Sequence, residues 1–438
     1  MLDSLPQHSL IDLFESAADG RTGGPASDSI TRMLKAIRAH LGMDVAFASE
    51  ITGGMVHVRH ADICADGPIH VGDAFPIEDS YCQRIIDGRL PQLMPDTSLV
   101  PAAAALKPTS AVPVGALLSV PIRLRDGRTY GTFCCFSFAA NASLNDRDLA
   151  MLRAFAELAA AEIDVERTKE KVREGTVARI RAVIDQNLIR MVYQPVHRLS
   201  DGVITGVESL ARFPDCEVRP PSDWFAEAAE VGLEIELELA AARAALEGLP
   251  YLPENISLGI NLSPATLLSD ALEPLIAAVP IGRIVVELTE HAAIQDYAGL
   301  ARALLPLRQR ARLAIDDVGA GYSGMRHILD LAPDLIKLDM SLVRDIDKDP
   351  ARRALALAMV AFASGIDGEI VAEGVETAAE LAVLLELGVP KAQGYYLSRP
   401  MPLMAARQFL LGSRGVADDH PRRPSPLPGE KRFRPIAI

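Results

Sequence analysis

The sequence predicts an α/β protein in which a (β/α)8 barrel over residues 190–412 follows a smaller α+β domain over residues 29–164. Eight β-like runs alternate with helical stretches in the C-terminal part, a pattern typical of a closed barrel. Short strands flanked by two helices fill the N-terminal part. The length of 438 residues and the hydrophobic content of 49% are those of a globular chain with two or three domains.

The α+β domain follows a separate N-terminal segment, residues 1–28. An opening helix is expected at residues 30–41 and an apolar closing helix at residues 147–163. Between them lie β-like runs at residues 45–51, 55–60, 117–122 and 129–138, with the turn signal Asp126-Gly127 between the last two. Cys134-Cys135 falls in the last run, where burial in the core is expected and a redox or haem role is the alternative.

A helical linker is expected over residues 165–189. Seven of the nine residues from 166 to 174 are charged, and apolar residues then recur at Val177, Ile180, Ile184 and Leu188. This spacing predicts a helix with a narrow apolar seam. Two interpretations stay open, a solvated spacer helix and a dimer stalk between a sensor and an output domain.

Composition excludes several classes of protein. The net charge of −14 argues against a polymeric nucleic-acid partner, which requires basic patches. The acidic N-terminus is unlike a signal peptide, and the longest apolar run is far too short to span a bilayer, so no membrane partner is expected. Five cysteines without framework spacing indicate a reduced, cytoplasmic compartment. Residues 413–438, rich in Pro and Arg, are expected to be a disordered tail.

Polar side chains mark the ends of the expected barrel strands, where the loops of a closed barrel converge on an active site. The eight runs are residues 191–197, 205–210, 257–262, 284–288, 312–318, 335–339, 369–372 and 392–397. In the same order, the polar residues that mark them are Gln194, Glu208, Asn261, Glu287, Asp316-Asp317, Lys337, Glu373 and Gln393. Acids, amides or a lysine at so many strand ends predict an active site at this edge of the barrel.

The oxygen donors of this set suit hard divalent cations, Mg²⁺ or Mn²⁺, rather than zinc. Adjacent Asp316 and Asp317 can reach one site only where the strand ends and the chain turns, and their charges then require a cation between them. Two neighbouring metal ions suit in-line attack of water on a phosphodiester. Lys337 could hold the water or neutralise developing charge, and Glu373 could bind the second metal or accept a proton.

At these residues the barrel resembles the EAL family of cyclic di-GMP phosphodiesterases. The motifs that carry the resemblance are Tyr193-Gln194-Pro195-Val196, Glu208-Ser209-Leu210-Ala211-Arg212, Asn261-Leu262-Ser263-Pro264, Glu287-Leu288-Thr289-Glu290, Asp316-Asp317-Val318-Gly319, Lys337-Leu338-Asp339, Ala372-Glu373-Gly374-Val375-Glu376 and Gln393-Gly394-Tyr395-Tyr396. The resemblance implies hydrolysis of one phosphodiester of cyclic di-GMP to linear pGpG with Mg²⁺ or Mn²⁺.

The resemblance also implies roles for individual residues. Glu208, Asn261, Glu287 and Asp316 would be ligands of a first metal, and Asp316, Asp317 and Glu373 of a second. Lys337 and Glu373 would activate water, and Gln393 and Gln194 would line the site. Arg212 would contact a substrate phosphate, and Glu290 would anchor the glycine-containing loop 317–324, which could be a mobile lid. The triplet here is Glu-Ser-Leu rather than Glu-Ala-Leu, and the lid has Val and Ala where the family usually has Phe and Thr.

The first domain resembles a GAF sensor domain through Ser80-Tyr81-Cys82, Gly88, Leu90-Pro91, Val120-Pro121-Ile122, Asp126-Gly127 and Gly131. The resemblance implies an unknown small-molecule ligand and control of the barrel through the linker, in a homodimer. Two alternatives to a phosphodiesterase remain. One is a barrel that binds the dinucleotide without turnover, and the other is an enolase-like barrel, whose chemistry would have no need for Asp316-Asp317 and Glu373 around two ions. Synthesis of the dinucleotide is not supported, because neither Gly-Gly pair is followed by an acid-acid-Phe run.

Overall fold

The computed structural model describes residues 26–63, 69–78, 80–106, 113–214, 219–277, 279–289, 297–318 and 324–412. The C-terminal tail, Glu290 and most of the glycine-containing loop, residues 319–323, lie outside these ranges, as do residues 1–25. The chain divides into two compact units, and the boundary lies between residues 173 and 174. Among the described helices, none combines the length and the apolar character that a membrane crossing requires.

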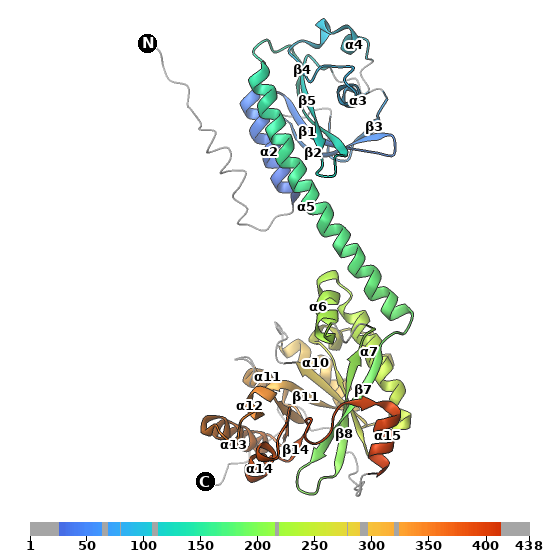
Figure 1. Ribbon diagram of the computed structural model, residues 1–438, viewed down its shortest axis with the longest axis vertical. Coiled ribbons are helices and arrows are strands. Elements are labelled where there is room, and N and C mark those ends of the chain that lie inside the picture. Colours follow the sequence, from blue (N-terminus) through green and yellow to red (C-terminus); the bar gives the residue numbers. More distant parts are fainter. Residues whose placement is uncertain are drawn as a thin grey trace. The chain divides into compact units, whose positions relative to one another are not determined.

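The first unit is built on one antiparallel sheet (Figure 1). Its six strands, in the order β3-β2-β1-β6-β5-β4, are β1 (Val45–Thr52), β2 (Met55–Ile63), β3 (Ala74–Pro76), β4 (Leu93–Met94), β5 (Ala116–Arg123) and β6 (Thr129–Ser137). The four longest strands are those that the sequence predicts, and the α+β class is confirmed. The short edge strands β3 and β4 carry too few residues to show a periodic pattern.

Side chains alternate between the two faces of this sheet, and each face has its own core. Ala46, Leu118 and Cys135 lie on the face covered by helix α2 (Ala26–Leu41) and the first turns of helix α5 (Asp146–Asp185). Phe47 and Cys134 lie on the opposite face, under the short elements α3 (Tyr81–Ile86), η1 (Thr97–Leu99) and α4 (Pro101–Ala104). The two adjacent cysteines therefore belong to different cores.

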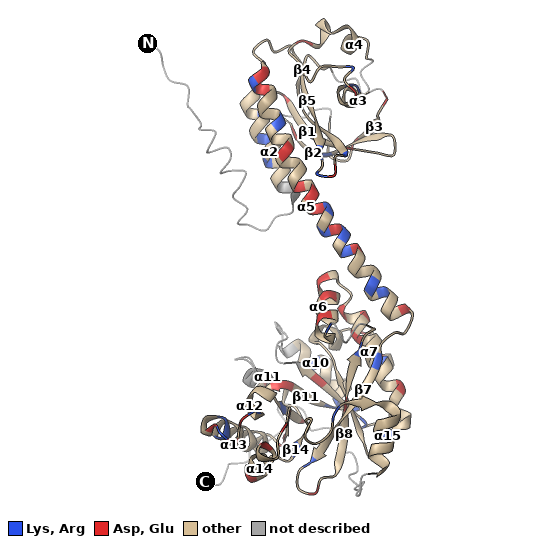
Figure 2. Cartoon of the chain, in the orientation of Figure 1, with Lys and Arg blue, Asp and Glu red and all other residues tan. Residues whose placement is uncertain are grey.

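Helix α5 is longer than the predicted closing helix and includes residues 165–185 of the predicted 165–189 linker. Asn145 caps it, because its side-chain oxygen accepts the backbone N–H of Arg147 at 2.9 Å, and Asn187 ends it in the left-handed conformation. Residues 165–175 are exposed, and Figure 2 shows charges of both signs along this stretch.

Most of the apolar seam predicted after residue 176 does not face solvent, although its last member, Leu188, is 37% exposed. Ile180 and Val183 are buried in a cluster with Phe213, Trp224 and Leu237, which belong to the same second unit, and Val177 and Ile184 pack against this cluster. Because packing within the chain covers Val177, Ile180 and Ile184, these positions give no support to the dimer-stalk interpretation. The sequence pattern showed an apolar face but not its partner, which lies about 30–60 residues further along the chain.

The second unit is a closed eight-stranded barrel surrounded by helices, which confirms the predicted fold class (Figure 1). Its strands are β7 (Arg190–Arg198), β8 (Ile204–Arg212), β9 (Ser257–Asn261), β10 (Ile284–Thr289), β11 (Ala311–Val318), β12 (Leu335–Leu338), β13 (Glu369–Ala372) and β14 (Lys391–Ala392). Pairing of β14 with β7 closes the barrel, and β15 (Met401–Pro402) adds to the outer edge of β7.

One strand departs from the expected alternation. β7 runs antiparallel to both of its neighbours in the barrel, β8 and β14, whereas the pairings from β8 round to β14 are parallel. Only residues 199–203 separate β7 from β8, and a parallel crossover requires a dozen residues or more. The first two strands are therefore a hairpin and not a βα unit.

The helices cover the outside of the barrel. They are α6 (Pro221–Val231), α7 (Glu234–Gly248), η2 (Leu249–Tyr251), α8 (Pro264–Leu267), α9 (Leu272–Ala277), α10 (Tyr297–Arg308), α11 (Gly324–Leu331), α12 (Met340–Val343), α13 (Pro350–Gly365), α14 (Ala378–Glu386) and α15 (Leu403–Gly412). Outward-facing strand residues such as Ile260, Leu288 and Ile315 pack with buried residues of these helices in the main core.

Candidate metal centre in the barrel

The inward-facing residues of four neighbouring strands form two layers. The lower layer is apolar and consists of Val285, Ala314, Leu335 and Val371, which pack together inside the barrel. Two residues further along the same strands, on the same inward face, stand Glu287, Asp316, Lys337 and Glu373. The strand period of two therefore places a charged layer on top of an apolar one, toward the C-terminal ends of the strands.

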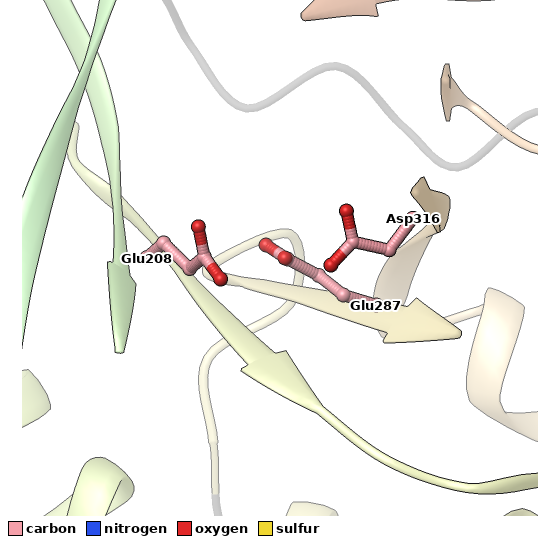
Figure 3. A group of neighbouring side chains, drawn as sticks. All are labelled: Glu208, Glu287 and Asp316. Atoms are coloured by element: carbon pink, nitrogen blue, oxygen red, sulfur yellow. The ribbon is translucent and has the colours of Figure 1, made fainter. Parts of the chain in front are cut away.

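Carboxylates from separate strands converge in this layer. Oxygen atoms of Glu208, Glu287 and Asp316 lie within 4.8 Å of one another, and so do oxygen atoms of Asp316, Asp317 and Glu373. Figure 3 shows the first three side chains pointing toward one another from β8, β10 and β11. Asp316 belongs to both groups, so the two candidate cation sites share one ligand.

A bulge in β11 lets two consecutive carboxylates reach the same region. The register between β11 and β12 shifts between Ile315 and Val318, and Asp317 has a φ of 56°. The backbone N–H of Asp317 donates to a carboxylate oxygen of Asp316 at 2.9 Å. The sequence predicts that both aspartates reach one site where the chain turns, and the structure achieves this through a bulge near the end of the strand.

Lys337 lies at the centre of the carboxylates. Its Nζ is 2.6 Å from Glu287, 2.7 Å from Glu373, 3.0 Å from Asp316 and 3.3 Å from Glu208. The ammonium is completely buried, so it supplies the compensating positive charge that a cluster of buried carboxylates requires.

The pKa values of the cluster follow from burial and from these contacts. Burial alone would lower the pKa of Lys337, but the surrounding carboxylates outweigh it and raise the pKa well above its usual value. Burial raises the pKa of Glu287 to about 8. Burial would also raise the pKa of Glu208, but Lys337 and two amide hydrogen bonds hold it below the ordinary value.

Amide side chains hold the carboxylates in place. The Nε2 of Gln393 donates to Glu208 at 2.6 Å and to Glu373 at 2.8 Å, and the Nδ2 of Asn261 donates to Glu208 at 3.1 Å. Gln194 lies opposite Glu208 in the β7–β8 ladder and donates to the carbonyl of Ser398 at 3.2 Å. Gln194 is thus in the middle of β7 and not at its end, because β7 runs antiparallel to the strand beside it.

The remaining predicted site residues lie further away or outside the described residues. Arg212 is four residues beyond Glu208, near the end of β8, with its Nη1 donating to the carbonyl of Ala211 at 2.8 Å. It shares the face of the strand that carries Glu208. Glu290 falls outside the described part of the chain.

Comparison with known proteins agrees with this architecture. A family model of the EAL domain matches residues 177–400. The chain belongs to the EAL domain family. A GAF domain model matches residues 27–163, so a GAF domain precedes the EAL domain.

Several bacterial proteins are similar to this chain. The cyclic di-GMP phosphodiesterase RocR of Pseudomonas aeruginosa is 32% identical over 262 residues, which are 57% of this chain and 67% of RocR. The signaling protein YkoW of Bacillus subtilis is 29% identical over 255 residues, 56% of this chain. The chain covers 32% of YkoW and 36% of an uncharacterized signaling protein of Caulobacter vibrioides.

A solved structure shows the same fold as this EAL protein. The EAL enzyme Bd1971, in a form bound to cAMP and cyclic di-GMP, aligns with a TM-score of 0.52 and 22% sequence identity. The alignment covers 65% of this chain and 82% of that one.

The donor set of the EAL domain fits hard divalent cations. Both candidate groups consist of carboxylate oxygens, and the amide of Asn261 lies beside the first. Such oxygen ligands suit Mg²⁺ or Mn²⁺ and not zinc. The buried Lys337 ammonium among the same oxygens indicates a place where positive charge is favourable.

Two residues of the EAL domain support the site in ways that the sequence did not predict. A Cβ atom on Gly259 would lie 2.1 Å from a carboxylate oxygen of Glu287, so a larger residue here would displace that carboxylate. The hydroxyl of Ser209, in the Glu-Ser-Leu triplet, donates to the carbonyl of Gly259 at 2.5 Å. A glycine inside an apolar strand is a signal of close approach that could have identified the first of these.

Proposed function

We propose that the protein is a metal-dependent phosphodiesterase that hydrolyses cyclic di-GMP to linear pGpG. The observation that carries the proposal is the pair of carboxylate groups that share Asp316 in the interior of the barrel. The name of RocR, a cyclic di-GMP phosphodiesterase, supports the choice of substrate. Water adds across one of the two phosphodiester bonds, the P–O bond to the leaving ribose oxygen breaks, and that oxygen takes up a proton.

In this proposal Glu208, Asn261, Glu287 and Asp316 hold one cation and Asp316, Asp317 and Glu373 hold the other. When bound, the cations supply Lewis-acid chemistry that polarises the phosphodiester and promotes ionisation of the attacking water. The Lys337 ammonium orients the water and stabilises negative charge, and Glu373, 2.7 Å from that ammonium, accepts a proton.

The other residues position the reactants. Gln393 keeps the carboxylates of Glu208 and Glu373 in a fixed relation, because its Nε2 donates to both. Gln194 lines the same site, and Arg212, which presents a guanidinium from the end of β8, binds a substrate phosphate. Glu290 anchors the lid loop that follows β11 in the chain.

A turnover assay on the full-length protein tests the proposal. With cyclic di-GMP and Mn²⁺ or Mg²⁺ we expect linear pGpG, and a chelator should abolish it. Glu208→Gln should lower the rate by roughly 10²-fold or more, the effect of removing one preorganised catalytic group. Glu386→Gln, which changes an exposed carboxylate on α14, is the matched control. Binding of cyclic di-GMP without product under all metal conditions would identify a receptor instead.

We further propose that the GAF domain binds a small molecule and regulates hydrolysis through α5. This one helix contributes Leu152 and Phe155 to the core of the GAF domain, and Ile180 and Val183 to the cluster around Phe213. Phe213 directly follows Arg212, so that cluster abuts the proposed phosphate contact. Lys169→Pro, which breaks the exposed part of α5, should change the rate relative to Lys169→Ala. Equal rates for the two variants would argue against control through this helix.

The exposed part of α5 also supports a homodimer. Leu158, Val165 and Val172 recur every seven residues, with 37%, 44% and 65% of their surface exposed. This spacing is that of one of the two apolar positions in a coiled-coil heptad, and Asp164 would face Lys169 of a second copy in a parallel pair. A Val165→Lys, Val172→Lys double variant should shift the mass measured by light scattering to that of a monomer, whereas Val165→Ile should not.

A further inference from the structure

The GAF domain contains a buried group of thiols and hydroxyls that the proposed function does not use. It consists of Ser49, Cys82, Ser119, Thr132 and Cys134, and we call it the thiol–hydroxyl cluster. All five are almost fully buried. Cys82 comes from α3 and the other four from β1, β5 and β6, on the sheet face that α3 covers.

Both sulfur atoms of the cluster contact the same oxygen atom. The Thr132 hydroxyl donates to the Sγ of Cys82 at 3.0 Å, and the Sγ of Cys134 lies 3.1 Å from that hydroxyl. Ser119 is 2.9 Å from Cys134, and Ser49 is 2.9 Å from the Thr132 hydroxyl. The two thiols therefore approach each other across one side chain, although 51 residues lie between them in the sequence.

The two thiols differ in character. A hydrogen bond from Cys134 lowers the pKa of Cys82 in spite of burial, and the Thr132 and Ser49 hydroxyls lower it further. Burial raises the pKa of Cys134, and its contact with Cys82 raises it more. A thiolate is the nucleophile in thiol oxidation, and the hydroxyl of Thr132 donates to the Cys82 sulfur at 3.0 Å, so we assign Cys82 as the sulfur that reacts first and Cys134 as the one that resolves the product.

We propose that Cys82 and Cys134 are a modification site that forms a disulfide with a two-electron oxidant of the hydroperoxide class. The Cys82 thiolate attacks the terminal peroxide oxygen, the O–O bond breaks, and Cys82 becomes a sulfenic acid while its former proton and the released hydroxide form water. The Cys134 thiol then attacks the Cys82 sulfur, the S–O bond breaks, and the hydroxyl leaves with the Cys134 proton as a second water. Two thiols lose two electrons, which reduce one hydroperoxide.

Cys135 provides a matched control within the same strand. Its side chain projects to the opposite face of the sheet, into the core with Ala46 and Leu118, and burial raises its pKa. A small oxidant that reached the interior without selectivity would modify Cys135 as readily as Cys134. Selective linkage of Cys82 to Cys134 is therefore the property that the cluster predicts.

The test uses the full-length protein, treated with hydrogen peroxide and then denatured, alkylated and digested. We expect the peptides of Cys82 and Cys134 to become linked, with a mass about 2 Da below the sum of the two reduced peptides. The Cys135 thiol should remain unoxidised and be recovered in its alkylated form. Dithiothreitol should reverse the linkage. The thermal midpoint of the GAF domain should rise on oxidation in the wild type and in Cys135→Ser, but not in Cys82→Ser or Cys134→Ser.

Full alkylation of Cys82 and Cys134 in the wild type after peroxide treatment would overturn the proposal, and so would linkage of either to a different cysteine. Both outcomes are measured on the wild-type protein, so the proposal is tested even where a serine variant fails to fold. Neither the alkylation nor the disulfide linkage depends on whether the barrel hydrolyses cyclic di-GMP.

Discussion

The molecule buries two polar clusters, and the polar groups of the two clusters are compensated in different ways. In the barrel, four carboxylates surround one ammonium, that of Lys337. In the GAF domain, the thiol–hydroxyl cluster is composed of neutral groups that donate to and accept from one another. The first cluster carries a surplus of negative charge even with Lys337 in place when its carboxylates are ionised, whereas the second is balanced by hydrogen bonds alone.

This difference has an energetic consequence. Breaking a buried ion pair leaves an uncompensated charge in a region of low dielectric, which costs more than losing a neutral hydrogen bond. The barrel cluster should therefore respond strongly to cations and to loss of Lys337, while the GAF cluster should respond weakly to both. A functional cation site needs a strong response to cations. A site of slow covalent modification can respond to them weakly.

The largest expected effect is that of Lys337→Met on the stability of the metal-free barrel. Removing the ammonium leaves Glu208, Glu287, Asp316 and Glu373 without their shared partner, and we expect the free energy of unfolding at pH 8 to fall by about 3–5 kcal/mol. Mn²⁺ should restore more stability to the variant than to the wild type, since the cation replaces the lost charge. Thermal or denaturant unfolding with and without Mn²⁺ measures both quantities.

Lys391→Met is the control for this experiment. Lys391 is also buried, at 6% exposure against 3% for Lys337, and its Nζ pairs with the carboxylate of Glu369 at 2.8 Å. Its loss should cost less, and Mn²⁺ should not repair it. Equal costs for the two lysine variants, or equal responses to Mn²⁺, would contradict the idea that the barrel cluster is set apart by its excess of charge.

A smaller effect is expected from Thr132→Val in the GAF cluster. Valine keeps the shape of the side chain but removes the hydroxyl that contacts Ser49, Cys82 and Cys134. We expect the free energy of unfolding to fall by about 1–2 kcal/mol, because the hydrogen bonds that are lost join neutral groups. Denaturant unfolding should give the same loss with and without Mn²⁺.

Thr129→Val, near the start of the same strand, is the control, and its effect should stay within about 0.5 kcal/mol. A loss for Thr132→Val as large as that of Lys337→Met would mean that charge is not what separates the two clusters.

The two clusters also differ in how far the sequence reveals them. Charged residues such as Glu287 and Lys337 are conspicuous inside apolar strands, and their place two residues beyond an apolar position indicates an inward-facing layer. Serine, threonine and cysteine are ordinary residues in strands, so nothing in the run around Cys134 signals that Cys82 lies against it. Contacts between distant segments depend on the packing of α3 against the sheet, which no local pattern contains.

The fold shows the same division between local and long-range information. The barrel and the principal strands of the GAF domain follow from hydrophobic patterns. The expected alternation of strands and helices does not include the hairpin of β7 and β8, although the short connection at residues 199–203 indicates it. Ile180 and Val183 are buried by Phe213 and by residues of α6 and α7. The periodicity of α5 alone could not identify these packing partners.

A third polar pair, in which His197 is half-buried, is intermediate between the two clusters and gives the smallest expected effect. His197, near the end of β7, lies with its Nε2 3.0 Å from the hydroxyl of Ser398. Burial lowers the pKa of His197, and the backbone contact with Gly202 raises it by less, so the folded state favours the neutral ring. This pair is neutral like the GAF cluster but can acquire a charge like the barrel cluster.

The sign of the pH dependence follows from that lowered pKa. The unfolded state binds a proton near the ordinary pKa of about 6.5, before the folded state does, so His197 destabilises the barrel as the pH falls from 6.5 toward the lower folded value. The stability is fully present above this range. His197→Gln should therefore reduce the loss of thermal midpoint between pH 7 and pH 5, by less than about 3 °C, as measured by thermal scans at matched pH. An unchanged pH profile would show that the carboxylate cluster alone sets the acid response of the barrel.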